Sequence, residues 1–157
     1  MRFRSAVAGP IVAVAAVLAL GLACAAGSAS QAGGSAGLFT LRQAAAGAHE
    51  YAANCARCHG AHLEGAMGSP LRGASFTTLG TESGLSLGSF FHFVITETPV
   101  GAGGSLSHGQ YVEILAFILH ENGYRPGAQP LTFGAALGSR VRIAEQPPRA
   151  VPHDRDQ

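Results

Sequence analysis

Two cysteines and a histidine stand close together in the segment Cys55-Ala56-Arg57-Cys58-His59. Two thiols three residues apart, followed directly by an imidazole, form the pattern for covalent haem attachment. In that chemistry the thiols add to the two vinyl groups of one haem, and the next side chain lies beneath the iron. The segment therefore predicts one covalently bound haem c, attached at Cys55 and Cys58, with His59 as the proximal iron ligand.

A close cysteine pair has three other interpretations. A structural zinc site needs four ligands, commonly a second such pair, and no cysteine follows Cys58. A thioredoxin-like redox pair expects a βαβ context and is not usually followed by His, whereas the flanks here have the patterns of helix and loop. A plain disulfide between Cys55 and Cys58 is the third alternative. The Cys-x-x-Cys-His motif, an export signal and helical flanks all favour haem attachment, which is the interpretation we prefer.

The start of the chain has the layout of a secretory signal. Residues 1–4 include two arginines, residues 11–22 are apolar and uncharged, and small residues follow. We therefore predict a signal peptide over residues 1–30 and a periplasmic location. Two alternatives stay open, both of which would attach the protein to the membrane through this segment. One is an uncleaved anchor, since the apolar stretch approaches the roughly 20 residues that span a bilayer; the other is lipidation at Cys24.

The number of charged residues limits which classes of binding partner we expect. All ten basic residues are Arg, and two of them, Arg2 and Arg4, belong to the predicted signal. The remaining chain has eight Arg against nine acidic residues, a net charge of about −1. No basic patch of the size that nucleic acid binding needs remains, so we expect no nucleic acid partner.

The rest of the chain has the size of one domain. Residues 31–37 consist of small and polar residues and predict a linker. Residues 146–157 carry prolines and charges and predict a disordered tail. Residues 38–145 are left as the domain that carries the motif.

Helical periodicity predicts the elements that position the motif. Thr40 can cap a helix over residues 41–54 that delivers the cysteines at its end. Its expected apolar side consists of Leu41, Ala44, Ala48, Tyr51 and Ala52. The glycine-rich stretch that follows His59, up to Gly73, has little periodicity and predicts a loop.

Two further helices are expected downstream. One begins after Ser86 and ends before Pro99. The clearest helix runs from about residue 108 to 122, with Ser107 as N-cap and Gln110 three residues on. Its apolar face consists of Tyr111, Ile114, Leu115, Ile118 and Leu119. A short helical or extended piece is expected within residues 131–143.

With these motifs, the chain resembles the class I c-type cytochromes over roughly residues 38–123. The segment from Asn54 to Gly60 is similar to the family's haem-attachment helix, and residues 107–119 are similar to its C-terminal helix. The resemblance implies an all-α fold, a small bundle of three or four helices wrapped around haem, in which the C-terminal helix crosses the N-terminal helix near Tyr51. A Cys55→Ser, Cys58→Ser double variant is then expected not to fold stably.

The resemblance also extends to a loop on the His59 side. Gly68-Ser69-Pro70-Leu71-Arg72-Gly73 is similar to the family loop Gly-Pro-x-Leu-x-Gly, whose backbone carbonyl hydrogen-bonds the proximal His. Ser69 stands where the family has Pro, a change that keeps the carbonyl but lowers the stiffness of the loop. Ser69, Pro70 and Leu71 are therefore implied as secondary haem-site residues.

The chain departs from the family at the second axial ligand. The family usually provides a Met sulfur just ahead of a Pro, and here that position is Thr98, followed by Pro99. Three residues are candidates for the sixth iron ligand: His92, Thr98 and Met67. We expect Met67 to be a packing residue rather than a ligand, because it lies in the loop on the His59 side.

The resemblance implies a periplasmic electron carrier rather than an enzyme. Its partners would be redox proteins, such as a periplasmic dehydrogenase or a membrane electron-transfer complex, and its cofactor one haem c with iron. The alternative is a haem-based binder or sensor of small ligands, with an open sixth position because Thr98 replaces the Met. Weak peroxidase-type activity stays open with that alternative, although His92 is the sole candidate for its acid–base group.

Overall fold

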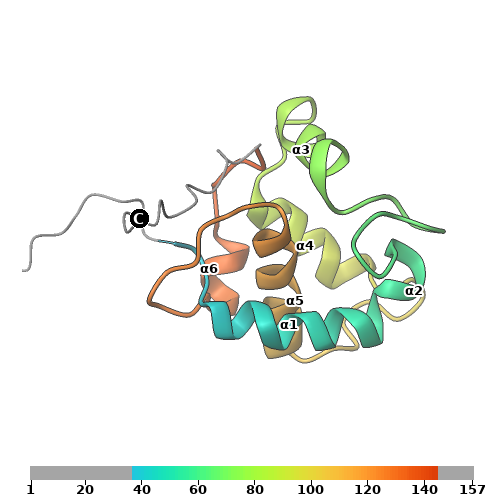
Figure 1. Ribbon diagram of the computed structural model, residues 1–157, viewed down its shortest axis with the longest axis horizontal. Helices are drawn as coiled ribbons and strands as arrows, with labels where there is room; N and C mark the ends of the chain where they lie inside the picture. The colour runs from blue at the N-terminus through green and yellow to red at the C-terminus, as the bar shows by residue number, and fades with distance from the viewer. Residues whose placement is uncertain (1–36, 145–157) are drawn as a thin grey trace, which may run out of the picture. The chain divides into compact units, whose positions relative to one another are not determined.

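The computed structural model describes residues 37–144, which lie within the second of two units of the chain, residues 34–157. Six helices and no strand form in these residues (Figure 1). They are α1 (Leu41–Asn54), α2 (Ala56–His59), α3 (Gly73–Thr81), α4 (Leu87–Glu97), α5 (His108–Glu121) and α6 (Phe133–Leu137). The predicted all-α fold is confirmed. The predicted signal peptide (1–30), all of the predicted linker except Gly37, and the predicted tail (146–157) lie outside the described residues.

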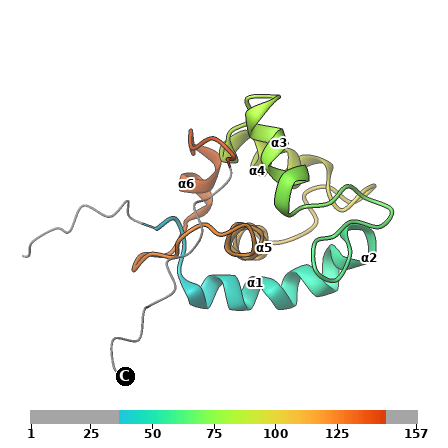
Figure 2. The same ribbon diagram turned by 45° about the horizontal axis from the view of Figure 1, so that its top comes forward.

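Helices α1 and α5 cross, as Figure 2 shows with α5 seen almost end-on beside α1. The backbones approach so closely at Gly47 that a Cβ there would collide with the carbonyl of Glu113. One turn further on, the Tyr51 ring packs against Phe117 with 5.2 Å between ring centroids. The predicted contact of the C-terminal helix with the attachment helix near Tyr51 is therefore confirmed.

The apolar faces of these two helices were predicted with different success. All five residues expected on the core face of α5 are buried. On α1 the buried residues are Ala44, Gly47 and Tyr51, while Leu41 is 59% exposed and Ala52 is exposed as well. The prediction for Leu41 and Ala52 was wrong because α5 approaches α1 along the line through Gly47, a residue that contributes no hydrophobic signal to a sequence pattern.

Side-chain amides fix the starts of both helices. Thr40 and Gln43 form a reciprocal capping box on α1, and Ser107 and Gln110 form another on α5. The Gln110 amide also donates to the Glu50 carboxylate across the crossing, at 2.8 Å. Gln43 also exchanges two hydrogen bonds, each 2.8 Å long, with the backbone of Leu131, which lies far from α1 in the sequence. The same residues that cap the helices therefore tie distant segments of the chain together.

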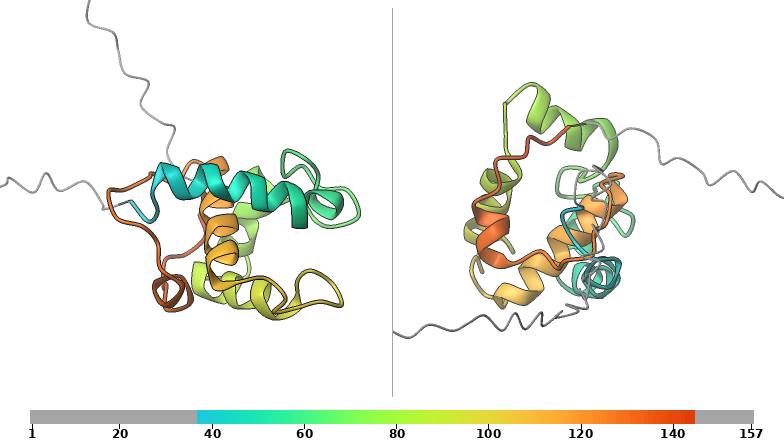
Figure 3. Two further views of the ribbon diagram at one scale, coloured as in Figure 1. Left: turned by 90° about the horizontal axis from the view of Figure 1, so that it is seen from below. Right: turned by 90° about the vertical axis from the view of Figure 1, so that its left-hand side faces the viewer.

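Two helices, α2 and α3, were not expected from the sequence. α3 has no side-chain cap and is held by Phe76, whose buried ring meets Phe90 edge-on at 5.4 Å. α2 is a single turn of four residues. The third short element, α6, lies beside α4 (Figure 3) and packs Phe133 against Phe91. The described residues thus hold six helices rather than three or four, because these elements are stabilised by tertiary packing and carry little periodicity of their own.

Candidate haem site

The end of α1 and the start of α2 position the two cysteines. Cys55 closes α1 by donating its backbone N–H to the carbonyl of Tyr51 at 2.8 Å. The Cys55 carbonyl then accepts hydrogen bonds from the backbone N–H groups of Cys58 and His59, both at 3.0 Å. This single turn places two thiols and an imidazole on one short rigid element.

All three side chains line one cleft, which holds about 710 Å³ of space including its solvent-open mouth. Most of the lining is apolar and comes from α4, α5 and the segments beside them. These residues are Leu71, Phe90, Phe93, Val94, Pro99, Val100, Leu106, Ile114 and Ile118. A mainly apolar cleft with two thiols and an imidazole in its lining fits a covalently attached haem.

His59 is oriented by the loop between α2 and α3. Its Nδ1 lies 2.7 Å from the backbone oxygen of Ser69, and because a carbonyl oxygen can only accept, Nδ1 is the donor in this hydrogen bond. Gly68 lies directly against the ring, since a Cβ there would be 2.8 Å from Cε1 of His59. The hydrogen bond expected from the family-like loop is present, made by the residue that replaces the family's Pro.

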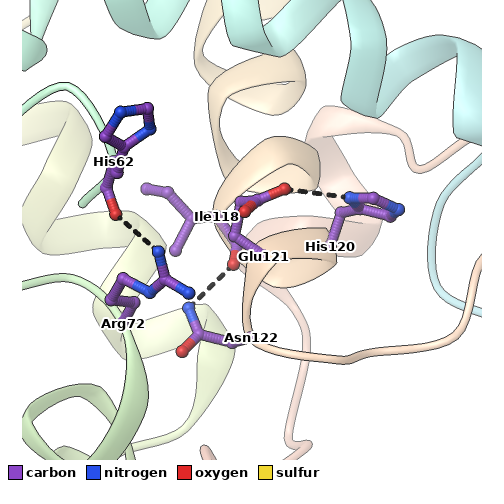
Figure 4. A network of polar contacts seen from close by, with 6 residues as sticks. All are labelled: His62, Arg72, Ile118, His120, Glu121 and Asn122. Carbon is purple, nitrogen blue, oxygen red and sulfur yellow. Dashed lines mark hydrogen bonds and ion pairs between the residues drawn. The ribbon is translucent and has the colours of Figure 1, made fainter. Parts of the chain in front are cut away.

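The loop is itself fastened to the end of α5. Asn122 donates from its side-chain nitrogen to the carbonyls of Leu71 and Ile118, both at 2.8 Å. Its side-chain oxygen accepts from the backbone N–H of Gly73 at 2.9 Å. Figure 4 shows Asn122 reaching the Ile118 carbonyl, close to the hydrogen bond from Arg72 to the backbone of His62. Position and orientation of the loop near His59 therefore depend on α5 as well.

The three candidates for a sixth iron ligand lie in different places. Thr98 lines the cleft, and its hydroxyl donates to the carbonyl of Val94 at 2.6 Å. His92 is exposed on α4 and does not line the cleft. Met67 does not line it either, and its side chain is 72% exposed, so the expectation that Met67 packs in the interior was wrong. The structure brings only Thr98 of the three to the cleft that His59 lines.

Comparison with protein families agrees with this geometry. The family described as cytochrome C oxidase, cbb3-type, subunit III, matches residues 42–118, from the start of α1 to near the end of α5. The chain carries a c-type cytochrome domain. No curated protein and no solved structure matches the chain.

A c-type cytochrome domain fits an electron carrier rather than an enzyme, and it implies haem c, iron and redox protein partners. Cys55, Cys58 and His59 form the Cys-x-x-Cys-His motif of such a domain. Domains of this kind are typically exported. None of the helices between residues 37 and 144 is long and apolar enough to cross a membrane.

Burial of the cytochrome domain's attachment turn changes the acidity of two groups. Burial, reinforced by the neighbouring Cys58, raises the pKa of the Cys55 thiol to about 11. Tyr51 donates its buried hydroxyl to the carbonyl of Gly60 at 2.7 Å, and burial raises its pKa to about 12. Backbone N–H groups around Glu64, including that of His62 at 2.6 Å, lower the pKa of this exposed carboxyl. The Tyr51 hydroxyl and the Cys55 thiol are therefore neutral at physiological pH.

The other interpretations of the cysteine pair gain nothing from the structure. Cys55 and Cys58 are free thiols, so they form no disulfide with each other. Among residues 37–144, no three His, Cys, Asp or Glu side chains gather as a metal site would require. The flanks of the pair are helix and loop, without the strands of a thioredoxin-like unit.

Three aromatic residues that line the cleft, Phe90, Phe93 and Tyr111, were not recognised as site residues in the sequence. Tyr111 was expected in the core face of α5, and it also lines the cleft, where its hydroxyl donates to the Thr98 carbonyl at 2.9 Å. Phe93 lines the cleft although its side chain is 56% exposed. Helical spacing could have indicated Phe93, because it lies three residues after the buried Phe90 and shares its face.

Proposed function

We propose that this protein is a periplasmic monohaem cytochrome c that carries single electrons between redox partners. The observation that supports it best is that Cys55, Cys58 and His59 line one apolar cleft while the Ser69 carbonyl holds Nδ1 of His59. The number of haems is inferred from the sequence, which contains the attachment pattern once. We assign haem attachment to Cys55 and Cys58 and proximal ligation to His59.

Each residue of the site has a separate task in this proposal. Bound haem supplies the one-electron chemistry, and the protein tunes it. Cys55 and Cys58 hold the group covalently, and the Ser69 carbonyl keeps the proton of His59 on Nδ1, so that Nε2 is free to ligate. The apolar side chains exclude water, and burial of this kind is one of the levers that set the reduction potential.

The proposal extends to the parts of the chain around the site. We propose that residues 38–145 form the cytochrome domain, that residues 1–30 direct export and that residues 31–37 link the two. Residues 146–157 would form a disordered tail. The partners would be a periplasmic dehydrogenase or a membrane electron-transfer complex. The eight Arg and nine acidic residues that follow the predicted signal give no large charge of either sign for steering, so we expect partner recognition to depend little on salt.

The full chain matured in a haem-attaching periplasm provides the test. We expect one haem per chain, bound covalently, as measured by the mass of the denatured protein and by its pyridine haemochrome spectrum. The cell fraction that contains the haem-bearing chain checks the proposed location. A reversible one-electron titration of the purified protein against mediators should then follow.

Matched variants identify the attachment residues. Cys55→Ser and Cys58→Ser should each remove one thioether, while Arg57→Ala, an exposed position within the same turn, should leave the haem content unchanged. His59→Ala should leave the thiols but remove the proximal ligand. A chain that acquires no covalent haem, or acquires it equally well without either thiol, would contradict the assignment.

A further inference from the structure

The cleft offers few groups that can ligate iron apart from those of the attachment turn. Among the described residues that line it, His59 is the only imidazole, and none is a methionine. Beyond Cys55, Cys58 and His59, the lining side chains are apolar except for those of Asn54, Thr98 and Tyr111. Imidazole and thioether are the usual axial ligands of haem iron in carriers of this type. Neutral amides and hydroxyls are much weaker ligands.

Each of the three polar groups is already engaged in a hydrogen bond within the protein. The Asn54 amide donates to the carbonyl of Glu50 at 2.8 Å. The hydroxyl of Tyr111 donates to the Thr98 carbonyl, and the hydroxyl of Thr98 donates to the Val94 carbonyl at 2.6 Å. The Thr98 oxygen keeps its lone pairs and can accept a hydrogen bond, but its proton is already in use.

Helical geometry explains why His92 does not bring a second imidazole into the cleft. Phe90, Val94 and Thr98 follow one another at intervals of four and all line the cleft. His92 lies midway between two of them, on a different face of α4, and is exposed. Bringing its imidazole into the cleft would require α4 to turn about its axis, which would expose the buried Phe90 and Phe91.

We propose that the protein leaves the sixth coordination position of its haem iron open to a small neutral ligand from outside. The inference rests on the proposed function, because it needs a haem held by Cys55, Cys58 and His59. The expected ligands are water on the oxidised protein and a neutral diatomic gas such as carbon monoxide on the reduced protein.

Thr98 determines which ligands can form a hydrogen bond at this site. Its free lone pairs suit a ligand that donates a hydrogen bond, such as water, while its committed proton leaves none for a ligand that only accepts. No acid–base pair lines the cleft within the described residues, since Thr98, Tyr111 and Asn54 are all neutral. The site therefore suits reversible binding of small molecules rather than their chemical conversion.

The test uses the haem-loaded full chain and begins with its covalent haem content. If no haem is attached at Cys55 and Cys58, the proposed function fails, and this inference with it. With haem attached, optical spectra of the reduced protein are recorded with and without carbon monoxide, in the absence of denaturant. We expect a high-spin spectrum that shifts to a carbon monoxide complex at one gas molecule per haem.

Variants at position 98 provide the controls. Thr98→Met should supply a sulfur ligand, convert the spectrum to low spin and weaken carbon monoxide binding by about tenfold or more, because an internal ligand competes at high effective concentration. Thr98→Val, which has nearly the same shape but no hydroxyl, should weaken the binding of water to the oxidised protein, because the hydrogen-bond acceptor for that water is lost. His92→Ala and Met67→Leu should leave the spectrum unchanged.

A low-spin spectrum indifferent to carbon monoxide, on a chain that does carry haem, would overturn the inference and leave the proposed function standing. The variants then identify the ligand that was overlooked. Loss of the low-spin spectrum in His92→Ala or in Met67→Leu would assign it to that side chain. If neither variant changes the spectrum, His153→Ala tests a histidine outside the described residues.

Discussion

The two sides of the haem cleft use their polar groups differently. Around His59, in α2 and the loop that follows it, backbone carbonyls and an asparagine fix the ring, its proton and the loop. Around Thr98, at the end of α4, the polar groups bond one another and the rest of the surface is apolar. The first side holds one imidazole in one orientation, whereas the second side, within the described residues, presents neither an imidazole nor a methionine to the cleft. The comparison teaches that the contacts that orient His59 do not depend on the residues around Thr98.

The largest expected effect comes from removing the covalent link on the His59 side. The Cys55→Ser, Cys58→Ser double variant should not fold stably, because haem fills the cleft and supplies much of the core. The lost packing should cost at least as much as truncating a large aromatic core side chain, about 3–5 kcal/mol. Thermal melting followed by circular dichroism measures the loss, with Arg57→Ala as the control. Melting of the double variant at the parent's temperature would show that the cleft is stable without haem.

The next effect tests how tightly the ring of His59 is held. Gly68→Ala would place a methyl group 2.8 Å from Cε1 of His59, so the ring has to move away from the Ser69 carbonyl. We expect a loss of about 1–3 kcal/mol in the free energy of unfolding and a shifted reduction potential. Gly134→Ala is the control, because a Cβ at Gly134 meets no atom within 4 Å. Equal effects of the two variants would mean that the His59 side is not rigid.

A smaller effect is expected at the buried hydroxyl beneath the attachment turn. Tyr51→Phe removes the 2.7 Å hydrogen bond to the Gly60 carbonyl, which keeps only a weak donor, the Leu63 N–H at 3.4 Å. Urea unfolding at neutral pH should show a loss of about 0.5–1.5 kcal/mol.

The pH dependence of the same variant has a definite sign. Burial raises the pKa of Tyr51 from 10.0 to about 12, so above pH 10 the unfolded chain releases this proton before the folded protein does. The stability of the parent should therefore fall as the pH rises from 10 toward 12, while Tyr51→Phe lacks this part of the loss. The difference between parent and variant should shrink over that range. Parallel curves would contradict the assignment to Tyr51.

The smallest effect is expected at the surface of the His59 loop. The backbone N–H of Glu64 itself, followed by that of His62, lowers the pKa of the Glu64 carboxyl below its usual 4.5, so the carboxylate stabilises the folded loop above that pH. The stabilisation is lost as the pH falls through the lowered pKa. Glu64→Gln should be slightly less stable than the parent at neutral pH and equal to it in acid. Unfolding curves at several pH values measure the difference, with Glu82→Gln at another exposed position as control.

Strong periodicity and capping signals made α1, α4 and α5 predictable from the sequence, including the capping role of Ser107 and Gln110. Helices α2 and α3 were not, because α3 depends on the contact of Phe76 with Phe90, which no local pattern contains. Helix α6 lies within residues 131–143, where a short helical or extended piece was expected. The error in the predicted apolar face of α1 has the same origin as the missed helix α3. Gly47 is buried because it has no side chain, and only the position of α5 reveals that requirement.

The site was predictable to a similar extent. Consecutive residues define the attachment motif, so Cys55, Cys58 and His59 could be recognised in the sequence and are found lining one cleft. The side of the cleft around Thr98 is assembled from residues far apart in the chain, and there the sequence left three candidates for the sixth iron ligand open. Counting positions along α4 would have separated His92 from Phe90 and Val94, since residues two apart on a helix do not share a face.

The close approach at Gly47 also bears on how the domain forms. Residues 47 and 113 lie far apart in the sequence, so their contact closes a long loop that contains both the thiols and Thr98. Contacts of that kind form late and slowly compared with a helical turn. The turn from Cys55 to His59, by contrast, is a local structure that can form while the chain is still open. The turn that carries the two thiols therefore does not require the prior crossing of α1 and α5.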